Sequence, residues 1–334
     1  MVKGNVVVGQ SGGPTSVINS SLVGVFKAAK DAGVEKIYGM RNGIEGFLNK
    51  KVVDMSEYVK NELDIELLKR TPSSFLGTCR FKLPSVEESE ATYKLLFSIM
   101  EELDIKYFFY IGGNDSMDTI KKLSNYAEEI GSDIRFMGVP KTIDNDLAVT
   151  DHTPGYGSAA KYIASALKEI IRDVNTYPTE SVTVVEIMGR NAGWLTAAAA
   201  LSRAEDCPGP DLIYLPEVTF DYDRFLEQVK AVKKKKTSVV IAVSEGIKLA
   251  NGEYVCEDNK QATFEDSFGH KSLGGTALYL ADFIGANLGV KSRGIVFSTL
   301  QRCASHIVSR RDITEAFMAG SEAVQAALNG ETGK

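Results

Sequence analysis

The residues YFFYIGGNDS, at positions 107–116, indicate the fold of this chain. Tyr107–Ile111 is a continuous apolar run without polar alternation, which is typical of a strand covered on both faces. Two glycines end the run, and a helical pattern follows from about Ser116 to Ile130. A buried strand, a glycine turn and a helix form the repeating unit of a parallel α/β sheet.

The same unit recurs before and after this stretch. NVVVG at 5–9 ends in a glycine loop that precedes a helical pattern, and IRFMGV at 134–139 is a further apolar strand. The simplest account is two α/β domains, residues 1–150 and 151–300, joined near residue 150. The predicted strands are 5–9, 35–40, 107–111, 134–139, 181–187, 212–215, 238–243 and 294–298, and the predicted helices are 16–32, 87–103, 116–130, 158–172, 193–201, 222–235, 274–288 and 312–328.

Composition narrows the class of protein. The chain has 334 residues and a formal net charge of −6, which argues against nucleic acid or an anionic membrane surface as the main partner. The apolar fraction of 44% and the charged fraction of 25% are those of ordinary globular proteins. No window approaches the ~20 apolar residues of a membrane span, and the N-terminal apolar run is too short for a signal peptide.

Cysteine and histidine are sparse. The four cysteines form no CxxC pair and there are only three histidines, so a zinc cluster or a disulfide framework is not expected. Scattered single thiols suit a reducing compartment, and we predict a cytoplasmic protein.

Ligands of open α/β folds bind at the carboxyl ends of the strands, so the strand-end loops are the candidate sites. The first, Gly9–Thr15, is rich in glycine and precedes a helix, which suits either an anion site or a tight turn. It is not a Walker loop, because GxxxxGK[ST] occurs nowhere in the chain. A nicotinamide dehydrogenase fits poorly, because the second strand ends in Met40 instead of the acidic residue that binds a ribose.

Two further strand-end loops carry acidic residues. After the strand at 107–111, Asn114 and Asp115 offer oxygen ligands and Ser116 is placed to cap the next helix. After the strand at 134–139, PKTIDND brings two carboxylates two residues apart close to a lysine. That pattern suits a general base with a magnesium anchor, although an Asp- and Asn-rich turn also explains its last two residues.

Arginines mark the remaining loops. Arg190 follows the strand at 181–187, Arg302 follows the strand at 294–298, and Arg293 stands just before that strand. With Arg80 in FLGTCR, these cations beside glycine loops suggest phosphate clamps. Glu245 follows the strand at 238–243.

Taken together and in this order, SGG followed by Asn19, then GGNDS, PKTIDND, MGR and LQR resemble the phosphofructokinase family over nearly the whole chain. The resemblance implies two Rossmann-like three-layer α/β/α domains with the active site in the cleft between them, and a return of the chain to the first domain near 300–325. It implies phosphoryl transfer to the 1-hydroxyl of fructose 6-phosphate, with Mg²⁺ as the cofactor. A homodimer or homotetramer is expected. In the family a further strand and helix usually follow the position of Lys334, so either a truncated sequence or an unusual C-terminus is consistent with the resemblance.

The resemblance assigns a role to each motif residue. Asp144 matches the general base, and Thr142 lies near the transferring phosphoryl group. Lys141 and Arg190 join them as catalytic residues. The phosphoryl donor is expected to contact Gly12, Arg80, Asp115 and Ser116. Magnesium is expected to be bound by Asn114, Asp115 and Asp146. The residues expected to bind the sugar phosphate are Thr142, Ile143, Asp144, Met188, Gly189, Arg190, Glu245, Arg293, Thr299 and Arg302.

Two positions bear on the phosphoryl donor. Family members that use ATP carry glycine where this chain has Asp115 and Lys141, and the pyrophosphate-dependent branch carries these charged residues. An aspartate at the place of the α-phosphate of ATP repels it: two like charges ~4 Å apart at an effective dielectric of ~20 cost about 4 kcal/mol. Lys141 adds a positive charge for pyrophosphate. We therefore predict pyrophosphate as the donor.

Some positions depart from the family pattern. Asn114 replaces an aspartate of GGD, Thr299 stands where many members have histidine or tyrosine, and Ser181 replaces an arginine that crosses between subunits in many ATP users. Two alternative functions remain open: an ATP-dependent enzyme, and a regulatory subunit that binds phosphates without catalysis. The phosphoryl acceptor is also open, since another sugar phosphate such as sedoheptulose 7-phosphate has the same phosphate and hydroxyl pattern.

Overall fold

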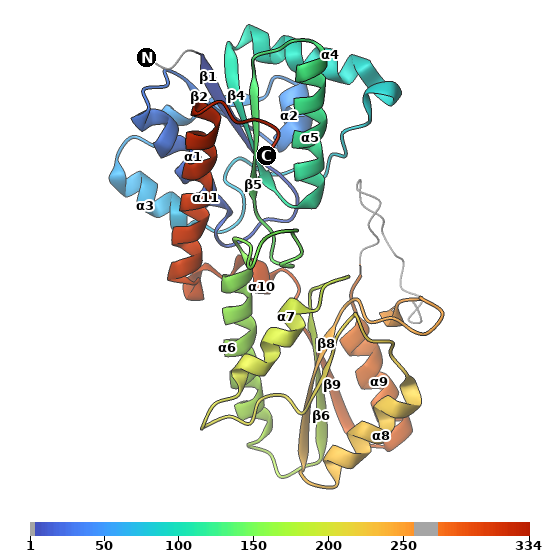
Figure 1. Ribbon diagram of the computed structural model, residues 1–334. Coiled ribbons are helices and arrows are strands. Elements are labelled where there is room, and N and C mark those ends of the chain that lie inside the picture. The colour runs from blue at the N-terminus through green and yellow to red at the C-terminus, as the bar shows by residue number, and fades with distance from the viewer. Residues whose placement is uncertain (1–3, 257–272) are drawn as a thin grey trace. The chain divides into compact units, whose positions relative to one another are not determined.

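The computed structural model describes residues 4–256 and 273–334 and resolves into two compact units (Figure 1). The first unit comprises Met1–Ile143, Leu147–Ser158 and Val308–Lys334. The second unit comprises Asp144–Asp146 and Ala159–Ile307. Each unit has its own sheet and its own hydrophobic core, and each is described by itself.

The first unit is built on a five-stranded sheet in the order β3-β2-β1-β4-β5. Its strands are β1 (Asn5–Gln10), β2 (Ile37–Met40), β3 (Val52–Asp54), β4 (Ile105–Gly112) and β5 (Arg135–Pro140). The edge strand β3, which the sequence did not predict, pairs with β2 in antiparallel fashion, so this otherwise parallel sheet is mixed at one edge. With only three residues, β3 offers no apolar pattern long enough to be recognised in the sequence.

Helices cover both faces of this sheet, as the apolar strand pattern predicted. Val6 and Val8 of β1 enter one hydrophobic cluster with α1 and α11, while Val7 enters a second cluster with α2, α4 and α5. Figure 1 shows the two groups of helices on opposite sides of the strands. The helices are α1 (Ile18–Asp31), α2 (Gly43–Leu48), α3 (Glu62–Arg70), α4 (Val86–Glu102), α5 (Asn114–Glu129) and α11 (Arg310–Leu328).

The second unit has a parallel four-stranded sheet in the order β7-β8-β6-β9. Val182 and Val184 of β6 pack with β8, α8 and α9 in one core, while α6 and α7 lie on the other side of the strands in Figure 1. Its elements are β6 (Ser181–Ile187), β7 (Leu212–Tyr214), β8 (Ser238–Ser244), β9 (Lys291–Val296), α6 (Tyr156–Val174), α7 (Trp194–Ala197), α8 (Tyr222–Lys233), α9 (Thr276–Leu288) and α10 (Leu300–Cys303). Two such α/β units confirm the predicted fold class.

Two element predictions were misplaced. The last strand was predicted at 294–298, but β9 covers Lys291–Val296. As an edge strand, β9 tolerates charged residues that mask its strand character in the sequence. The predicted helix at 193–201 is the short α7 followed by a 3₁₀ turn at Ala198–Ser202.

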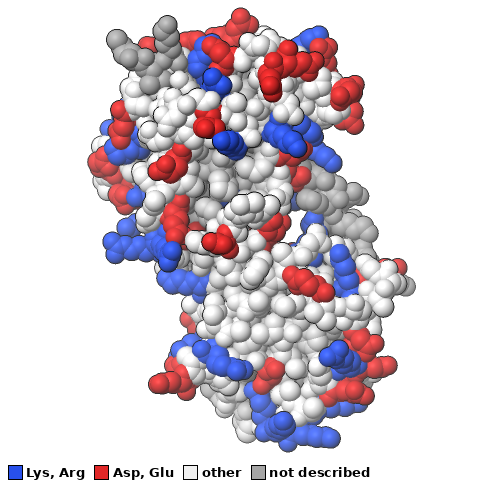
Figure 2. Space-filling model, in the orientation of Figure 1, with Lys and Arg blue, Asp and Glu red and all other residues white. Residues whose placement is uncertain are grey.

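Surface charge and helix hydropathy bear on the setting of the protein. Acidic and basic side chains are interspersed on the face shown in Figure 2, so the net charge of −6 is not gathered in one region of that face. Within residues 4–256 and 273–334, none of the helices combines the length and the apolarity that crossing a bilayer requires.

A buried carboxylate fastens the returning helix α11 to the start of α6. Asp312 is only 3% exposed, and its oxygens accept hydrogen bonds from the Gly155 N–H at 2.9 Å, the Ser158 N–H at 2.9 Å and the Ser158 Oγ at 2.5 Å. Gly155 in turn forms a parallel bridge with Thr142 of the PKTIDND loop. Asp312 thereby anchors the backbone on which that loop rests.

We expect Asp312→Ala to lower the free energy of unfolding by about 3 kcal/mol, because three buried donors lose their acceptor. The matched control is Asp64→Ala, since Asp64 occupies the same third position of α3 but receives the Lys60 and Asn61 N–H groups at the surface. There we expect a loss of about 1 kcal/mol. Urea denaturation measures both, and equal losses would contradict the anchoring role of Asp312.

Candidate active site

The glycine loop after β1 is held by a buried lysine from the end of β5. The Nζ of Lys141 donates to the Ser11 carbonyl at 2.8 Å and to the Gly13 carbonyl at 2.7 Å, and Lys141 is only 2% exposed. Gly12, between these two residues, has a φ of +71°, a conformation that favours glycine. A positive charge therefore lies directly against the loop that the sequence predicted to bind the donor.

The loop that carries Arg80 docks onto the same glycine loop. The Gly12 N–H donates to the Cys79 carbonyl at 3.0 Å, and the Thr78 Oγ1 donates to the Gly12 carbonyl at 2.7 Å. Arg80, which follows directly, is exposed. The structure thus brings Gly12, Lys141 and the Arg80 loop together at the carboxyl edge of the first sheet.

Helix α5 begins at this edge with the GGNDS motif. The helix starts at Asn114 with Gly113 as its N-cap, so the prediction that Ser116 caps the helix was wrong. Ser116 instead lies buried in the first turn and packs against Gly112, where a Cβ would come within 1.9 Å of the Ser116 Oγ. Asn114 is exposed and Asp115 is partly buried in this turn, and the Ser116 N–H donates to the Gly113 carbonyl at 3.0 Å.

The PKTIDND loop is divided between the two units. The Thr142 N–H donates to the Pro154 carbonyl at 3.2 Å, and the Thr153 Oγ1 donates to the Thr142 carbonyl at 2.7 Å. Ile143 is buried, while Asp144 and Asp146 belong to the second unit. Lys141 and Thr142 thus share the first unit with the predicted donor residues, and Asp144 shares the second with the predicted sugar residues.

In the second unit, the MGR loop after β6 meets Glu245 after β8. The Gly189 N–H donates to the Glu245 Oε1 at 3.3 Å, and the Ser244 Oγ donates to the Gly189 carbonyl at 2.6 Å. Gly189 has a φ of +136°, which favours glycine. The predicted residues Met188–Arg190 and Glu245 therefore come together at the carboxyl ends of two neighbouring strands.

Glu245 has an unusual acidity in this setting. Burial raises the pKa of its carboxyl to about 7, and the nearby carboxylates of Glu186 and Asp144 act in the same direction. The Gly189 N–H and the Arg190 guanidinium oppose the shift by stabilising the ionised form. Glu245 therefore changes its charge near neutral pH.

We expect this ionisation to govern sugar-phosphate binding, because only the carboxylate accepts hydrogen bonds from sugar hydroxyls through both oxygens. Between about pH 6 and about pH 8 the ionised fraction of Glu245 rises from roughly one tenth to nine tenths. The KM for sugar phosphate should therefore fall roughly fivefold to tenfold over that range. Initial-rate profiles measure this, and Glu245→Gln should lack the inflection; an unchanged profile in that variant would refute the role.

Gln301, to which the sequence analysis assigned no role, contacts the MGR loop from α10. Gln301 of α10 is 2% exposed, its Oε1 accepts the Met188 N–H at 3.1 Å and its Nε2 donates to the Ser298 carbonyl at 3.0 Å. It therefore connects the MGR loop with the short helix that carries Arg302, whose N-cap is the exposed Thr299. No local signal in the sequence identifies this role of Gln301, because Met188 lies 113 residues away along the chain.

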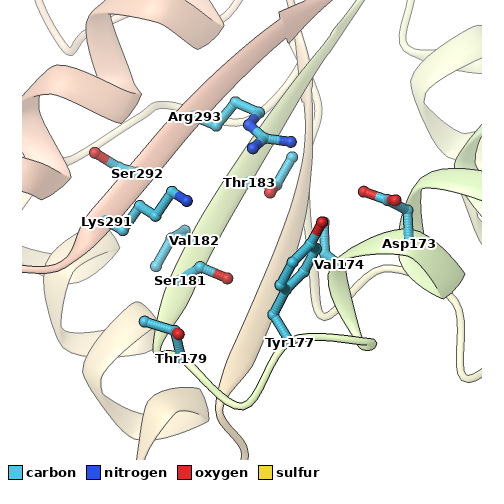
Figure 3. Close-up of a pocket in the computed structure, with 10 residues that line it drawn as sticks. All are labelled: Asp173, Val174, Tyr177, Thr179, Ser181, Val182, Thr183, Lys291, Ser292 and Arg293. Carbon is cyan, nitrogen blue, oxygen red and sulfur yellow. The ribbon is translucent and has the colours of Figure 1, made fainter.

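Arg293 lies apart from these loops. It is inside β9, in register with Thr183, and not ahead of the strand as predicted. Figure 3 shows it with Tyr177 and Asp173 around a pocket of about 130 Å³. The strand continues for three residues past Arg293, so this arginine does not belong to the strand-end loops of its own unit.

Metal binding was predicted at Asn114, Asp115 and Asp146. Among residues 4–256 and 273–334, no three His, Cys, Asp or Glu side chains gather as a metal cluster. The first two residues lie in the first unit and Asp146 in the second. Their oxygen donors fit Mg²⁺, which is commonly held by one or two carboxylates together with substrate phosphates rather than by a cage of protein ligands.

Comparison with known proteins identifies the family. The model described as "Phosphofructokinase" matches residues 5–327. The chain is 42% identical over 332 residues to the pyrophosphate–fructose 6-phosphate 1-phosphotransferase of Xanthomonas campestris, covering 99% of this chain and 78% of the relative. It is 34% identical over 329 residues to the sulfofructose kinase of Alkalicoccus urumqiensis, covering 98% of this chain and 81% of that relative.

A solved structure agrees with these matches. The pyrophosphate-dependent phosphofructokinase of Nitrosospira multiformis has a TM-score of 0.86 at 36% identity, covering 99% of this chain and 78% of that chain. The motifs, the two α/β units and these matches extend over nearly all of the sequence, and the chain therefore belongs to the phosphofructokinase family.

Proposed function

We propose that this protein catalyses the reversible transfer of a phosphoryl group from pyrophosphate to the 1-hydroxyl of fructose 6-phosphate. The observation that supports this donor is the buried Lys141 ammonium against the glycine loop, with Asp115 in the first turn of α5. Relatives with the pyrophosphate-dependent name support the same reading.

In the proposed step, the 1-hydroxyl oxygen forms a bond to a phosphorus of pyrophosphate. The bond from that phosphorus to the bridging oxygen breaks, inorganic phosphate leaves, and Asp144 accepts the hydroxyl proton. Lys141, Thr142 and Arg80 stabilise charge on the donor, and Arg190 and Glu245 orient the sugar phosphate. Mg²⁺, for which Asn114, Asp115 and Asp146 are the proposed ligands, supplies charge neutralisation on the donor phosphates when it is bound.

Discrimination against ATP follows from the charge of Asp115. Pyrophosphate ends where the α-phosphate of ATP continues, so only ATP must bring a further negative charge to this aspartate. At an effective dielectric of ~20, such a contact at ~4 Å costs about 4 kcal/mol. That difference corresponds to roughly a thousandfold in affinity.

The position of Arg293 and the assembly of the protein belong together. We infer that Arg293 serves the 6-phosphate from a second copy of the chain, in a homodimer or homotetramer. Its distance along β9 from the strand-end loops supports this. Sedimentation velocity tests the assembly, and an active monomer would refute it.

The absence of disulfides among the four cysteines, all of which the structure describes, supports a cytoplasmic location.

The function is tested by assaying fructose 1,6-bisphosphate formation with Mg²⁺ and either pyrophosphate or ATP. Turnover with pyrophosphate alone is expected, and turnover with ATP alone would overturn the donor assignment. Sugar-phosphate binding without turnover would favour a regulatory subunit. Sulfofructose and sedoheptulose 7-phosphate belong in the same assay, because one relative carries the name sulfofructose kinase.

A further inference from the structure

The side-chain amide of Asn19 is buried in the first unit, and both its nitrogen and its oxygen form hydrogen bonds. It stands at the second position of α1 and has no exposed surface. Its Nδ2 donates to the Thr71 carbonyl at 2.9 Å and to the Ser73 carbonyl at 2.8 Å. Its Oδ1 accepts the Phe75 N–H at 2.9 Å. One buried amide thus satisfies three backbone groups of the segment at 71–75.

Gln10 completes the arrangement from the end of β1. Its Nε2 donates to the Asn19 Oδ1 at 2.8 Å, and its Oε1 accepts the Leu76 N–H at 2.9 Å. Gln10 also has no exposed surface. The two amides therefore bind the backbone at 71–76, a stretch without helix or strand, through four hydrogen bonds.

This segment leads directly into the predicted donor-binding residues. Leu76 is four residues from Arg80, and the residues between them form hydrogen bonds to Gly12. At the other end, Gln10 immediately precedes Ser11, whose carbonyl accepts the Lys141 ammonium. The two amides therefore couple the glycine loop to the Arg80 loop at the point where both begin.

We propose that Asn19 and Gln10 are positioning residues that hold the Arg80 loop on the glycine loop and so determine the affinity for the pyrophosphate donor. The proposal rests on the proposed function of this site. An apolar core residue cannot replace either amide, because the loop backbone would then be buried without partners. Neither amide is required to contact the donor, since each acts through the backbone that carries Gly12 and Arg80.

The test is Asn19→Asp, which keeps the shape of the side chain but removes both Nδ2 hydrogen bonds. We expect the KM for pyrophosphate to rise at least tenfold, while the KM for fructose 6-phosphate changes less than twofold. Asn5→Asp is the matched control, because the Asn5 Nδ2 donates to the Leu103 carbonyl at the opposite end of β1. That control should leave both KM values unchanged.

A double-mutant cycle separates positioning from general destabilisation. If Asn19 acts through Arg80, Asn19→Asp should raise the KM for pyrophosphate less than twofold in an Arg80→Ala background. Independent effects that multiply would overturn the proposal, as would equal rises in both KM values. If Asn19→Asp does not fold, Gln10→Glu provides a second test. This variant keeps the acceptor for the Leu76 N–H but loses the donor to Asn19, and we expect the same selective rise in the KM for pyrophosphate. Calorimetric titration of the wild-type protein with inorganic pyrophosphate distinguishes failure of this proposal from failure of the proposed function. If the wild-type protein does not bind pyrophosphate, the proposed function itself is contradicted.

Discussion

The Asp144→Asn variant is expected to lose roughly a thousandfold in kcat while it still binds pyrophosphate and fructose 6-phosphate. General-base catalysis contributes factors of roughly 10² to 10⁴, and an amide of the same shape cannot take up the proton. Direct binding measurements beside single-turnover rates separate this loss from a loss of binding. Turnover close to that of the wild type would remove Asp144 from the mechanism.

The same variant has a second expected effect, which a misfolded protein would not produce. Asp144 raises the pKa of Glu245 through charge repulsion in the second unit. Removing that charge should move the pH at which sugar-phosphate affinity changes to a lower value. Binding of fructose 6-phosphate, followed from about pH 5.5 to about pH 8, measures the shift around the Glu245 pKa of about 7. An unmoved inflection would mean that the two carboxylates do not influence each other.

Much of the fold followed from local apolar runs. Strands such as β4 and β8 have uninterrupted apolar runs at their centres, so the local sequence alone identifies them as strands. The start of β9 was missed because Lys291 and Arg293 lie on an edge strand, where neighbours do not demand apolar residues. Helix α2 and strand β3 were missed because both are short and are held mainly by their neighbours in the first unit.

The candidate site was predictable in its motif residues and less so in its connections. Strand ends and glycines located Gly12, Asp144 and Arg190, because parallel strands present their loops at one edge. The partners of those residues were not predictable from local sequence. Gln301 joins Met188 across 113 residues and Asn19 joins Phe75 across 56, so only the folded chain reveals them.

The largest change in donor preference is expected from Asp115→Gly combined with Lys141→Gly. We expect the ratio of kcat/KM for ATP to that for pyrophosphate to rise roughly a thousandfold, since removing the repulsion at Asp115 is worth about 4 kcal/mol. Parallel assays with the two donors at fixed fructose 6-phosphate and Mg²⁺ measure the ratio. An unchanged ratio would refute the explanation based on these two charges.

The single variants should not contribute equally, and this difference follows from the contacts of Lys141. Asp115→Gly removes a partly buried charge from the first turn of α5 and should raise ATP use by itself. Lys141→Gly also deprives the Ser11 and Gly13 carbonyls of a buried donor, so it should lower the rate with both donors. Asp118→Ala is the matched control, because Asp118 lies one turn further along α5 in an exposed ion pair with Lys122. If that control shifted the donor ratio as much as Asp115→Gly, the net charge of α5 and not the position of Asp115 would select the donor.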